Sequence, residues 1–531
     1  MKTIKAGLLA LCCLISIKGS AQNAGDLDTS FNTTGKYTFD YGFQDNITSV
    51  CVQPADQKIV VAGTAITPSF SGKLLVTRLL PNGTPDLTFA NGGSLVITNF
   101  NESYAYEVLV RTDGKLLVAG SKADPAFQFS TLVMRLNNDG TIDTTFGNAG
   151  FATHEISTGD DFALAAAEQP DHKIVMAGSA LDASFNNQPC VVRLLENGNI
   201  DSTFGVNGVA LISVSNNDNE FNSVFLQPDG KIVASGHIDN GLTLGGQFDT
   251  DLITARFNAD GTPDNTFGTN GIVITSTGIE NVDDAFGNAL TSDGKILVSG
   301  FRVQPNFSYD AILLQYDSTG LADPSFGTNG LVVFDENVMD VSFDVKVQTD
   351  GKILSAGISG GFFPDDNDFW LARYNSDGTP DNTFGINGRV ITTILSGYDE
   401  AEAMAIQNDG KAVLAGKSYN GVQNDIAVAR FLTDGTSGLA DENDLFGWVA
   451  SPNPVAPGAF LRISGLQESK SELQIALFNL LGQPVATPQI ICSGCSMPTY
   501  RLPETISAGC YFLKIQSTSG RYGTIKLVVT E

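Results

Sequence analysis

The sequence predicts an all-β protein: a seven-bladed β-propeller followed by a small C-terminal β-sandwich. Two patterns each recur seven times between residues 22 and 437, and one of them recurs at steps of 57 to 64 residues. Each copy consists of about four short strand-like runs joined by turns, and no convincing amphipathic helix interrupts them. Four-stranded units repeated four to eight times are typical of propellers, in which neighbouring sheets bury one another's faces.

The first pattern is a lysine followed by a short apolar run that ends in glycine. Most of these lysines follow an Asp-Gly pair, and Asp-Gly between two apolar runs predicts a tight, primed hairpin turn with positive φ. In two units Gln57 or His172 precedes the lysine in place of glycine. The seven copies begin at Lys58, Lys115, Lys173, Lys231, Lys295, Lys352 and Lys411.

The second pattern is Asp-x-x-Phe with a glycine four residues after the phenylalanine. We expect its Asp to pair with the recurring Lys and Arg, and its Phe to lie in the core. Repetition in every unit favours this structural role over the alternative, a site for an anionic ligand. Typical copies are Asp264, Phe267 and Gly271 in one unit and Asp381, Phe384 and Gly388 in another.

The two ends of the array predict that the ring closes on itself. After the last strand-like run, at 425–431, the second pattern is missing, whereas its first copy precedes every blade strand. We therefore expect residues 25–34 to complete the last blade. The predicted domains are a signal peptide at 1–21, the propeller at 22–437, a linker at 438–450 and the sandwich at 451–531.

The repeat resembles a known family. The pattern DGKIhhAG…hhRhnxDGtxDxtFGxnG, with h apolar, is similar to the delta-60 repeat of bacterial propellers over about residues 25–435. The resemblance implies a β-propeller and no settled activity, so it bears on the fold and not on the function.

The N-terminus predicts export from the cytoplasm. Lys2 and Lys5 precede an apolar run of about a dozen residues, and small residues follow up to Ala21. This is the form of a secretory signal peptide, which we expect to be cut after Ala21. No other stretch is long and apolar enough for a membrane-spanning helix, so the mature chain is expected to have none.

The tail resembles the C-terminal sorting domain of the type IX secretion system. The resemblance implies that the tail binds the secretion machinery and brings the protein to the outer surface of a Gram-negative bacterium. Cys510, beside Tyr511, departs from the usual apolar residue, and an ordinary stalk domain is the alternative. The matching pieces are Pro452-Asn453-Pro454, the segment Leu477–Gln483, Ala508-Gly509 with Tyr511, and a last strand that ends near Lys526.

Charge and histidine content exclude several kinds of function. The signal peptide holds three Lys and no acid, and residues 451–531 hold six Lys or Arg and four acids. Residues 22–450 therefore carry 21 basic and 54 acidic residues, a balance of −33. This field repels nucleic acid and anionic lipid, so no nucleic-acid partner is expected. The three His stand in no recognisable catalytic or metal-binding arrangement, which disfavours an enzyme but leaves catalysis open, and no cofactor is predicted apart from the calcium considered below.

Five mature cysteines do not form a disulfide framework. Cys51 and Cys190 are expected to be small buried hydrophobic residues. A disulfide among Cys492, Cys495 and Cys510 is plausible, and its pairing stays open.

An acid recurs in five of the seven units, twelve residues before the lysine or, in the first unit, thirteen, and it raises the question of calcium. Equivalent positions in a propeller form a ring, and Ca²⁺ binds six to eight hard oxygens. The alternative, which we favour, is that each carboxylate makes a local side-chain-to-backbone turn. The candidates are Asp45, Asp161, Asp283, Asp340 and Asp399.

The loop after each lysine-to-glycine run differs in every unit and is where we expect a ligand. The leading hypothesis is a non-catalytic surface or released module that binds an extracellular glycan or protein. One alternative is a polysaccharide-active hydrolase or lyase that uses loop carboxylates, and another is a structural protein of the cell envelope. The candidate residues on this face are Phe248, Phe307, Tyr309, Phe362, Phe363, Asp365, Asp366 and Tyr419.

Overall fold

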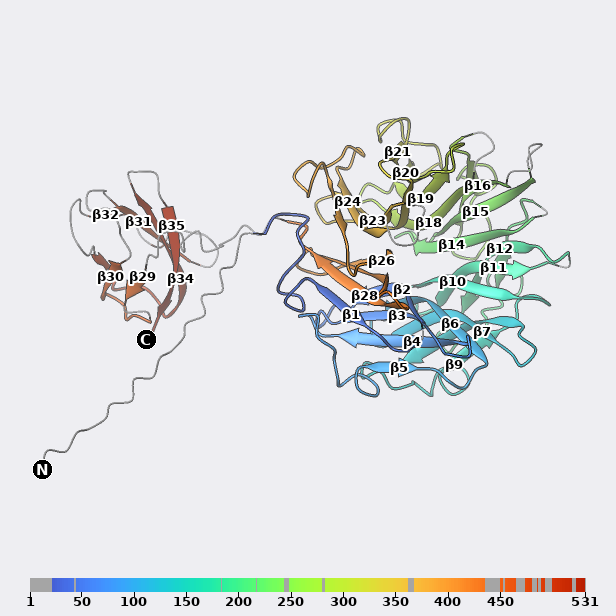
Figure 1. Cartoon of the computed structure of the whole chain (residues 1–531), viewed down its shortest axis with the longest axis horizontal. Helices are drawn as coiled ribbons and strands as arrows, with labels where there is room; N and C mark the ends of the chain where they lie inside the picture. The colour runs from blue at the N-terminus through green and yellow to red at the C-terminus, as the bar shows by residue number, and fades with distance from the viewer. Residues whose placement is uncertain are drawn as a thin grey trace, which may run out of the picture. The chain divides into compact units, whose positions relative to one another are not determined.

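The structure is a computed structural model whose contacts divide the chain into two compact units, Asn23–Asp434 and a C-terminal unit from Gly435 onward. Within the described residues every regular element is a β-strand (Figure 1). No helix there is long and apolar enough to cross a membrane. The described residues are 22–42, 44–182, 184–215, 217–242, 248–278, 282–361, 367–434, 449–451, 454–464, 473–479, 485, 489–491, 499–517 and 522–530.

The first unit consists of seven blades, each with four antiparallel strands, and one parallel pair, Tyr309 with Met339, joins blades 5 and 6. Blade 1 contains β2 (Gln44–Val52), β3 (Ile59–Ile66), β4 (Gly72–Leu79) and β5 (Ser94–Val96). Blade 2 contains β6 (Glu102–Val110), β7 (Leu116–Ala123), β8 (Phe129–Leu136) and β9 (Phe151–His154). Blade 3 contains β10 (Asp161–Glu168), β11 (Ile174–Leu181), β12 (Asn187–Leu194) and β13 (Val209–Leu211). Blade 4 contains β14 (Asn219–Leu226), β15 (Ile232–Leu242), β16 (Phe248–Phe257) and β17 (Ile272–Thr275).

The remaining blades follow the same order until the last. Blade 5 contains β18 (Asp283–Leu290), β19 (Ile296–Val303), β20 (Tyr309–Tyr316) and β21 (Leu331–Phe334). Blade 6 contains β22 (Met339–Val347), β23 (Ile353–Gly360), β24 (Asp368–Tyr374) and β25 (Arg389–Thr392). Blade 7 contains β26 (Asp399–Ile406), β27 (Ala412–Tyr419), β28 (Asn424–Phe431) and, from the other end of the chain, β1 (Lys36–Phe39). The predicted all-β, seven-bladed fold is therefore confirmed.

The N-terminal segment supplies the outermost strand of the last blade. In Figure 1 β1, in blue, lies beside β28, in orange, and Lys36 to Phe39 pair antiparallel with Ala429 to Ile426. The contact continues upstream, because Leu432 donates to the Asp26 carbonyl at 2.9 Å and Gly25 donates to the Leu432 carbonyl at 2.7 Å. The two ends of the array thus meet in one sheet, which removes the free edges that an open stack would leave.

Apolar side chains between neighbouring blades form the core. One cluster joins Ile47 and Val61 of blade 1 to Ala403 and Val413 of blade 7, and all four are buried. Similar clusters fill the other blade-to-blade contacts, so the contact between the first and last blades is packed like the rest. Each sheet is buried on both faces only because its neighbours cover it.

The repeated Asp-x-x-Phe segment joins each blade to the next one. In blade 4, the Asp264 carboxylate pairs with Lys231 at 3.2 Å and with Arg256 at 2.7 Å. The Arg256 guanidinium lies 4.6 Å from the centre of the Phe267 ring and donates to the Ser318 carbonyl of blade 5 at 2.8 Å. Burial disfavours ionisation, but hydrogen bonds from Thr266 and the Lys231 and Arg256 charges hold the Asp264 pKa below its usual range.

This joint recurs around the ring. The equivalent phenylalanines, Phe31, Phe89, Phe146, Phe204, Phe267, Phe326 and Phe384, are all fully buried. Six of them pack beside a glycine turn of the next blade that needs a small residue: a Cβ on Gly261, whose φ is +85°, would come within 2.9 Å of the Phe204 ring. The other ion pairs of the predicted set join Lys115 to Asp143, Lys295 to Asp323 and Lys352 to Asp381.

The hairpin turns before the lysines are not of the primed type that the Asp-Gly pairs suggested. Gly114 donates to the Arg111 carbonyl at 3.0 Å with φ of +82°, whereas Asp113 does not take positive φ. The turn is therefore an ordinary four-residue turn whose last position is left-handed. Where glycine is missing, Gln57 and His172 take the same conformation, with φ of 59° and 66°.

The C-terminal unit is a small β-sandwich. One sheet has the order β29 (Val449–Ser451), β30 (Phe460–Ser464) and β33 (Thr499–Arg501). The other has the order β32 (Gln489–Ile491), β31 (Leu473–Phe478), β34 (Gly509–Ser517) and β35 (Tyr522–Val529). Its core holds Leu461, Ile475, Tyr500, Leu513 and Leu527 among others. Ala21, Pro452, Asn453, Leu480–Gln483, Cys492 and Cys495 lie outside the described residues.

Candidate functional site

The strand order divides the propeller into two faces with different contents. In each blade the connections from the first to the second strand and from the third to the fourth lie on one face, because the strands alternate in direction. This turn face carries the lysine turns and the Asp-x-x-Phe joints. The connections from the second to the third strand, and from the fourth strand to the next blade, lie on the opposite face, which we call the loop face.

Buried acids hold the loops of the loop face through hydrogen bonds. Asp340 accepts hydrogen bonds from the backbone N–H groups of Glu336 and Asn337 at 2.8 and 2.9 Å, and from the Ser359 hydroxyl at 2.5 Å. Asp283 accepts both the N–H and the hydroxyl of Thr277 at 2.8 Å. Each acid therefore fixes the loop that enters its own blade, which is the local-turn arrangement.

The same role belongs to the other members of the acid ring. Asp45, Asp161 and Asp399 each accept an N–H from the loop just upstream, and all five candidates are buried. Burial raises the pKa of Asp45, Asp283, Asp340 and Asp399 to about 6 and raises that of Asp161. They lie on separate blades, and within the described residues no three His, Cys, Asp or Glu side chains gather as metal ligands would.

Of the aromatic residues expected to be exposed on the loop face, two are exposed and two are not. The side chains of Phe248 and Phe307 are 68% and 58% exposed. Tyr309 and Tyr419 are half-buried instead, because Tyr309 packs against Phe301 with ring centres 5.1 Å apart and Tyr419 covers Gly397. The remaining candidates, Phe362, Phe363, Asp365 and Asp366, lie outside the described residues.

Three exposed phenylalanines on this face were not predicted. Phe70, Phe127 and Phe185 are 72%, 62% and 80% exposed. Each occupies the place in its blade that Phe307 occupies in blade 5, seven residues after the glycine that ends the lysine pattern. That shared offset was visible in the sequence and could have identified them.

All four phenylalanines have the same unusual backbone conformation. Their φ angles are 60°, 63°, 65° and 66°, in the left-handed region that bulky residues rarely adopt. Each donates its N–H three residues back, as Phe127 does to the Asp124 carbonyl at 3.0 Å and Phe307 to the Gln304 carbonyl at 2.8 Å. The four loops are therefore copies of one turn with a phenylalanine at its last position.

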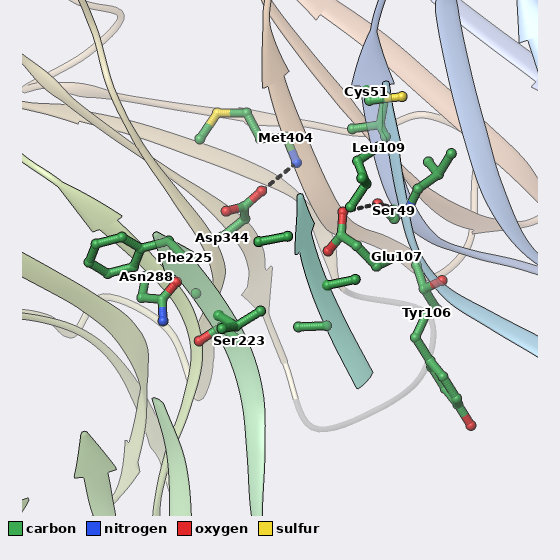
Figure 2. Close-up of a pocket in the computed structure, with 18 of the residues that line it drawn as sticks. Ser49, Cys51, Tyr106, Glu107, Leu109, Ser223, Phe225, Asn288, Asp344 and Met404 are labelled. Carbon is green, nitrogen blue, oxygen red and sulfur yellow. Dashed lines mark hydrogen bonds between the residues drawn. The ribbon is translucent and has the colours of Figure 1, made fainter. Parts of the chain in front are cut away.

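A cavity lies on the axis of the ring. The inner strands β2, β6, β10, β14, β18, β22 and β26 enclose a cavity of about 760 Å³ (Figure 2). Each inner strand has a β-bulge at the same place, for example between Ala105 and Glu107. Bulges turn side chains that would otherwise follow the strict alternation, and here they lie beside the cavity.

The cavity holds several carboxylates. Glu107 accepts a hydrogen bond from the Ser49 hydroxyl at 2.9 Å, and Asp344 accepts one from the Met404 N–H at 2.9 Å, both drawn as dashed lines in Figure 2. Lys346 pairs with Asp344 at 2.6 Å. Burial raises the pKa of Glu107 to about 7, and burial together with the Glu400 charge raises that of Glu402.

The histidines do not share one site. His237 pairs with Asp284 at 3.1 Å near the inner strands, and His172 pairs with Glu168 at 3.0 Å beside a turn. His154 bonds to the Gly198 carbonyl at 2.8 Å. Although burial opposes its protonation, the hydrogen bond to Asp284 and nearby acids raise the His237 pKa to about 9, so this side chain is a cation at neutral pH.

Comparison with known families explains the repetition. The matching model is described as a domain of unknown function, DUF5122, beta-propeller, and it matches residues 55–89, 111–146, 169–204, 227–267, 291–326, 348–384 and 407–437. Seven repeats of the chain therefore match the DUF5122 β-propeller model. The model's description states a fold and no activity, so the match leaves the function to be argued from the two faces.

Several solved structures are weakly similar to this chain. They include a protein of unknown function from Dyadobacter fermentans, at 10% identity and a TM-score of 0.38, with 62% of this chain and 94% of that one covered. Drosophila Semaphorin 2a has 8% identity and a TM-score of 0.42, with 93% and 98% covered. An ulvan lyase, from a new family of polysaccharide lyases, has 11% identity and a TM-score of 0.40, with 75% and 97% covered. No curated protein sequence matches the chain.

Proposed function

We propose that the protein is a non-catalytic extracellular binding module whose loop face contacts a glycan or another protein. The contrast between the two faces carries this proposal. The turn face repeats one ion-paired joint in blade after blade, while the loop face differs between blades and exposes large aromatic side chains. Residues that repeat everywhere serve the ring, and exposed side chains on a rigid scaffold are where recognition is expected.

A photo-crosslinking amino acid on each face tests the proposal whatever the ligand is. We would place it at Ser184, an exposed residue of a loop-face turn, and at Asp113, an exposed residue of a turn-face hairpin. The mature protein would then be irradiated on the surface of the bacterium that makes it. Adducts of glycan or protein formed only from Ser184 support a loop-face partner. Equal adducts from both positions, or adducts from Asp113 alone, refute it.

Export is part of the proposal. The N-terminal signal sequence and the resemblance of the tail to a type IX sorting domain support a secreted or surface-attached protein of a Gram-negative bacterium. Its first partner would then be the type IX machinery. Removal of residues 451–531 should leave the propeller inside the outer membrane, as measured by surface proteolysis of intact cells. Normal surface display of the truncated chain would contradict this route.

A polysaccharide-active hydrolase or lyase is the second candidate, because the axial cavity holds acids with raised pKa values. A carboxyl that titrates near neutral pH in a cavity suits acid–base chemistry, and the Glu107 pKa is about 7. The loop carboxylates Asp365 and Asp366 are the other candidates. Release of reducing or unsaturated ends from a polysaccharide, abolished in Glu107→Gln or in Asp365→Asn with Asp366→Asn, would establish this activity in place of simple binding.

A purely structural role in the cell envelope is the third candidate. In that case neither face needs a specific partner, and the crosslinker should give no distinct adduct from the loop face.

A further inference from the structure

We infer that the four left-handed phenylalanines, Phe70, Phe127, Phe185 and Phe307, are stacking platforms for an uncharged polysaccharide. We call these four residues the phenylalanine platforms. The inference rests on the proposed function, because it names the class of ligand that the loop face would bind.

The backbone conformation shows that the platforms do not serve the fold. A non-glycine residue in the left-handed region costs about 1 to 3 kcal/mol, and a bulky side chain is the least suited to it. On the turn face, five hairpins with the same hydrogen-bond pattern place glycine at this position, for example Gly114 and Gly230 with φ of 82° and 87°. In these turn-face hairpins glycine therefore occupies the left-handed position. In the four loop-face turns a phenylalanine with an exposed side chain occupies it instead.

Side-chain hydrogen bonds brace two of the four turns. Asp124 accepts hydrogen bonds from the N–H groups of Ala126 and Gln128 at 2.7 and 3.0 Å, and so braces the turn that carries Phe127. Asp182 braces the turn of Phe185 in the same way, through Ser184 and Asn186 at 2.7 and 3.0 Å. Three of the four turns also have a proline two residues before the phenylalanine. A ring held in place before binding loses little conformational freedom when a ligand stacks on it.

The surroundings of the platforms fit an uncharged, hydroxyl-rich ligand. The segments 67–71, 124–128, 182–186 and 304–308 contain no Lys or Arg. They hold Ser, Thr, Asn and Gln, with two aspartates, so they offer hydrogen bonds to hydroxyl groups and nothing to an anion. The net charge of −33 over residues 22–450 further disfavours acidic polysaccharides.

The spacing of the platforms fits a polymer better than a compact partner. They lie on blades 1, 2, 3 and 5, and packed sheets are roughly 10 Å apart. Each exposed ring stands in a turn of otherwise mostly polar residues on its own blade, whereas a protein interface needs a continuous apolar centre. A chain of repeated sugar rings can place an apolar face on several of these separated surfaces at once and gain affinity from each contact.

The test is affinity electrophoresis of the mature chain, residues 22–531, in gels that contain one polysaccharide. The probes are neutral β-glucan, xylan and mannan, with alginate as the anionic comparison. The test variant combines Phe127→Gly, Phe185→Gly and Phe307→Gly, because glycine suits the left-handed turn. The matched control combines Leu87→Ala, Val206→Ala and Ile386→Ala, three equally exposed apolar residues of the turn-face joints.

We expect at least one neutral polysaccharide to retard the wild-type chain and the control variant equally, and the platform variant to lose about tenfold or more in affinity. Retardation that persists in the platform variant would overturn the inference, and so would retardation by alginate alone. Absence of any retardation, or binding to phosphatidylcholine vesicles instead, would also overturn it. In each of these cases the crosslinking result at Ser184 decides separately whether the loop face has a partner.

Discussion

The joint of blade 5 is a natural variant of the joint in the other blades. Gln315 stands where the other blades have Arg, and Asp323 keeps only Lys295, at 2.7 Å, as its cation. Hydrogen bonds from Lys295 and Ser325 still lower the Asp323 pKa to about 2. The joint therefore tolerates the loss of one of its two cations. Its role can be tested by adding the missing arginine in blade 5 and by removing the arginine in another blade.

Gln315→Arg should stabilise the protein. The new guanidinium would meet Asp323 and the buried Phe326 ring, as Arg256 meets Asp264 and Phe267, and a desolvated ion pair with a cation–π contact contributes about 1 kcal/mol. Chemical unfolding should show this increase. The reverse change, Arg256→Gln, should lower the free energy of unfolding by about 2 kcal/mol. A decrease in the first variant would contradict the role given to the joint.

The phenylalanine platforms give the opposite prediction from the joint phenylalanines. Phe127→Gly should change the free energy of unfolding by less than about 1 kcal/mol, because relief of left-handed strain offsets the added flexibility of glycine. Phe146→Ala, in the buried joint of the same blade, should cost about 3 to 5 kcal/mol. Urea unfolding of both variants checks this pair. A large loss in Phe127→Gly would mean that the platform supports the fold after all.

Among the strands, β1 is the one on which closure of the ring depends. Deletion of residues 23–39 removes β1, the Asp28–Arg430 ion pair and the buried Phe31, and leaves β28 with a free edge. Thermal unfolding should then begin at least about 10 °C lower and become broader. Deletion of residues 435–531 is the control, since that unit is separate, and it should leave propeller unfolding unchanged. An unchanged melting temperature in the first variant would refute closure through β1.

The strands and the joints could be predicted from the sequence, whereas several side-chain contacts could not. The strands and the joint repeat seven times, so their agreement from one unit to the next was enough to predict them. Tyr309 and Tyr419 are half-buried and not exposed as expected, because they pack on Phe301 of the neighbouring strand and on Gly397 of the loop that enters the blade, contacts that the residue types alone do not reveal. Glu107 and Asp344 were missed because the five other inner strands have Ser, Ala or Gly at the same position after the bulge, and only the closed ring places these two acids in a cavity.

Across the whole propeller, the buried acids predict an unusual dependence of stability on pH. A carboxyl whose pKa rises on folding, as for Asp45, Asp283, Asp340 and Asp399 at about 6, binds more protons when folded between pH 4 and 6. The free energy of unfolding should therefore increase as the pH falls from 7 to about 5. His237, with a raised pKa, contributes in the same direction as the pH falls from about 9.

Below about pH 4 the sign reverses. Asp86, Asp201 and Asp323 have pKa values lowered to about 2, so their contribution is lost as they become protonated. Urea unfolding across pH 3 to 8 should show a maximum near pH 5, and Asp283→Asn should flatten the rise between pH 7 and 5. A steady loss of stability from pH 7 to 5 would contradict the environment given to the acid ring.

The residues of the turn face hold the blades together, whereas the residues of the loop face vary between blades. Hydrogen–deuterium exchange tests this division most directly, on the mature chain with and without the neutral polysaccharide that retards it most. We expect protection at 67–71, 124–128, 182–186 and 304–308, with no change at the turn-face hairpins around Gly114 and Gly230. Protection confined to those hairpins, or to the inner strands around Glu107, would contradict it.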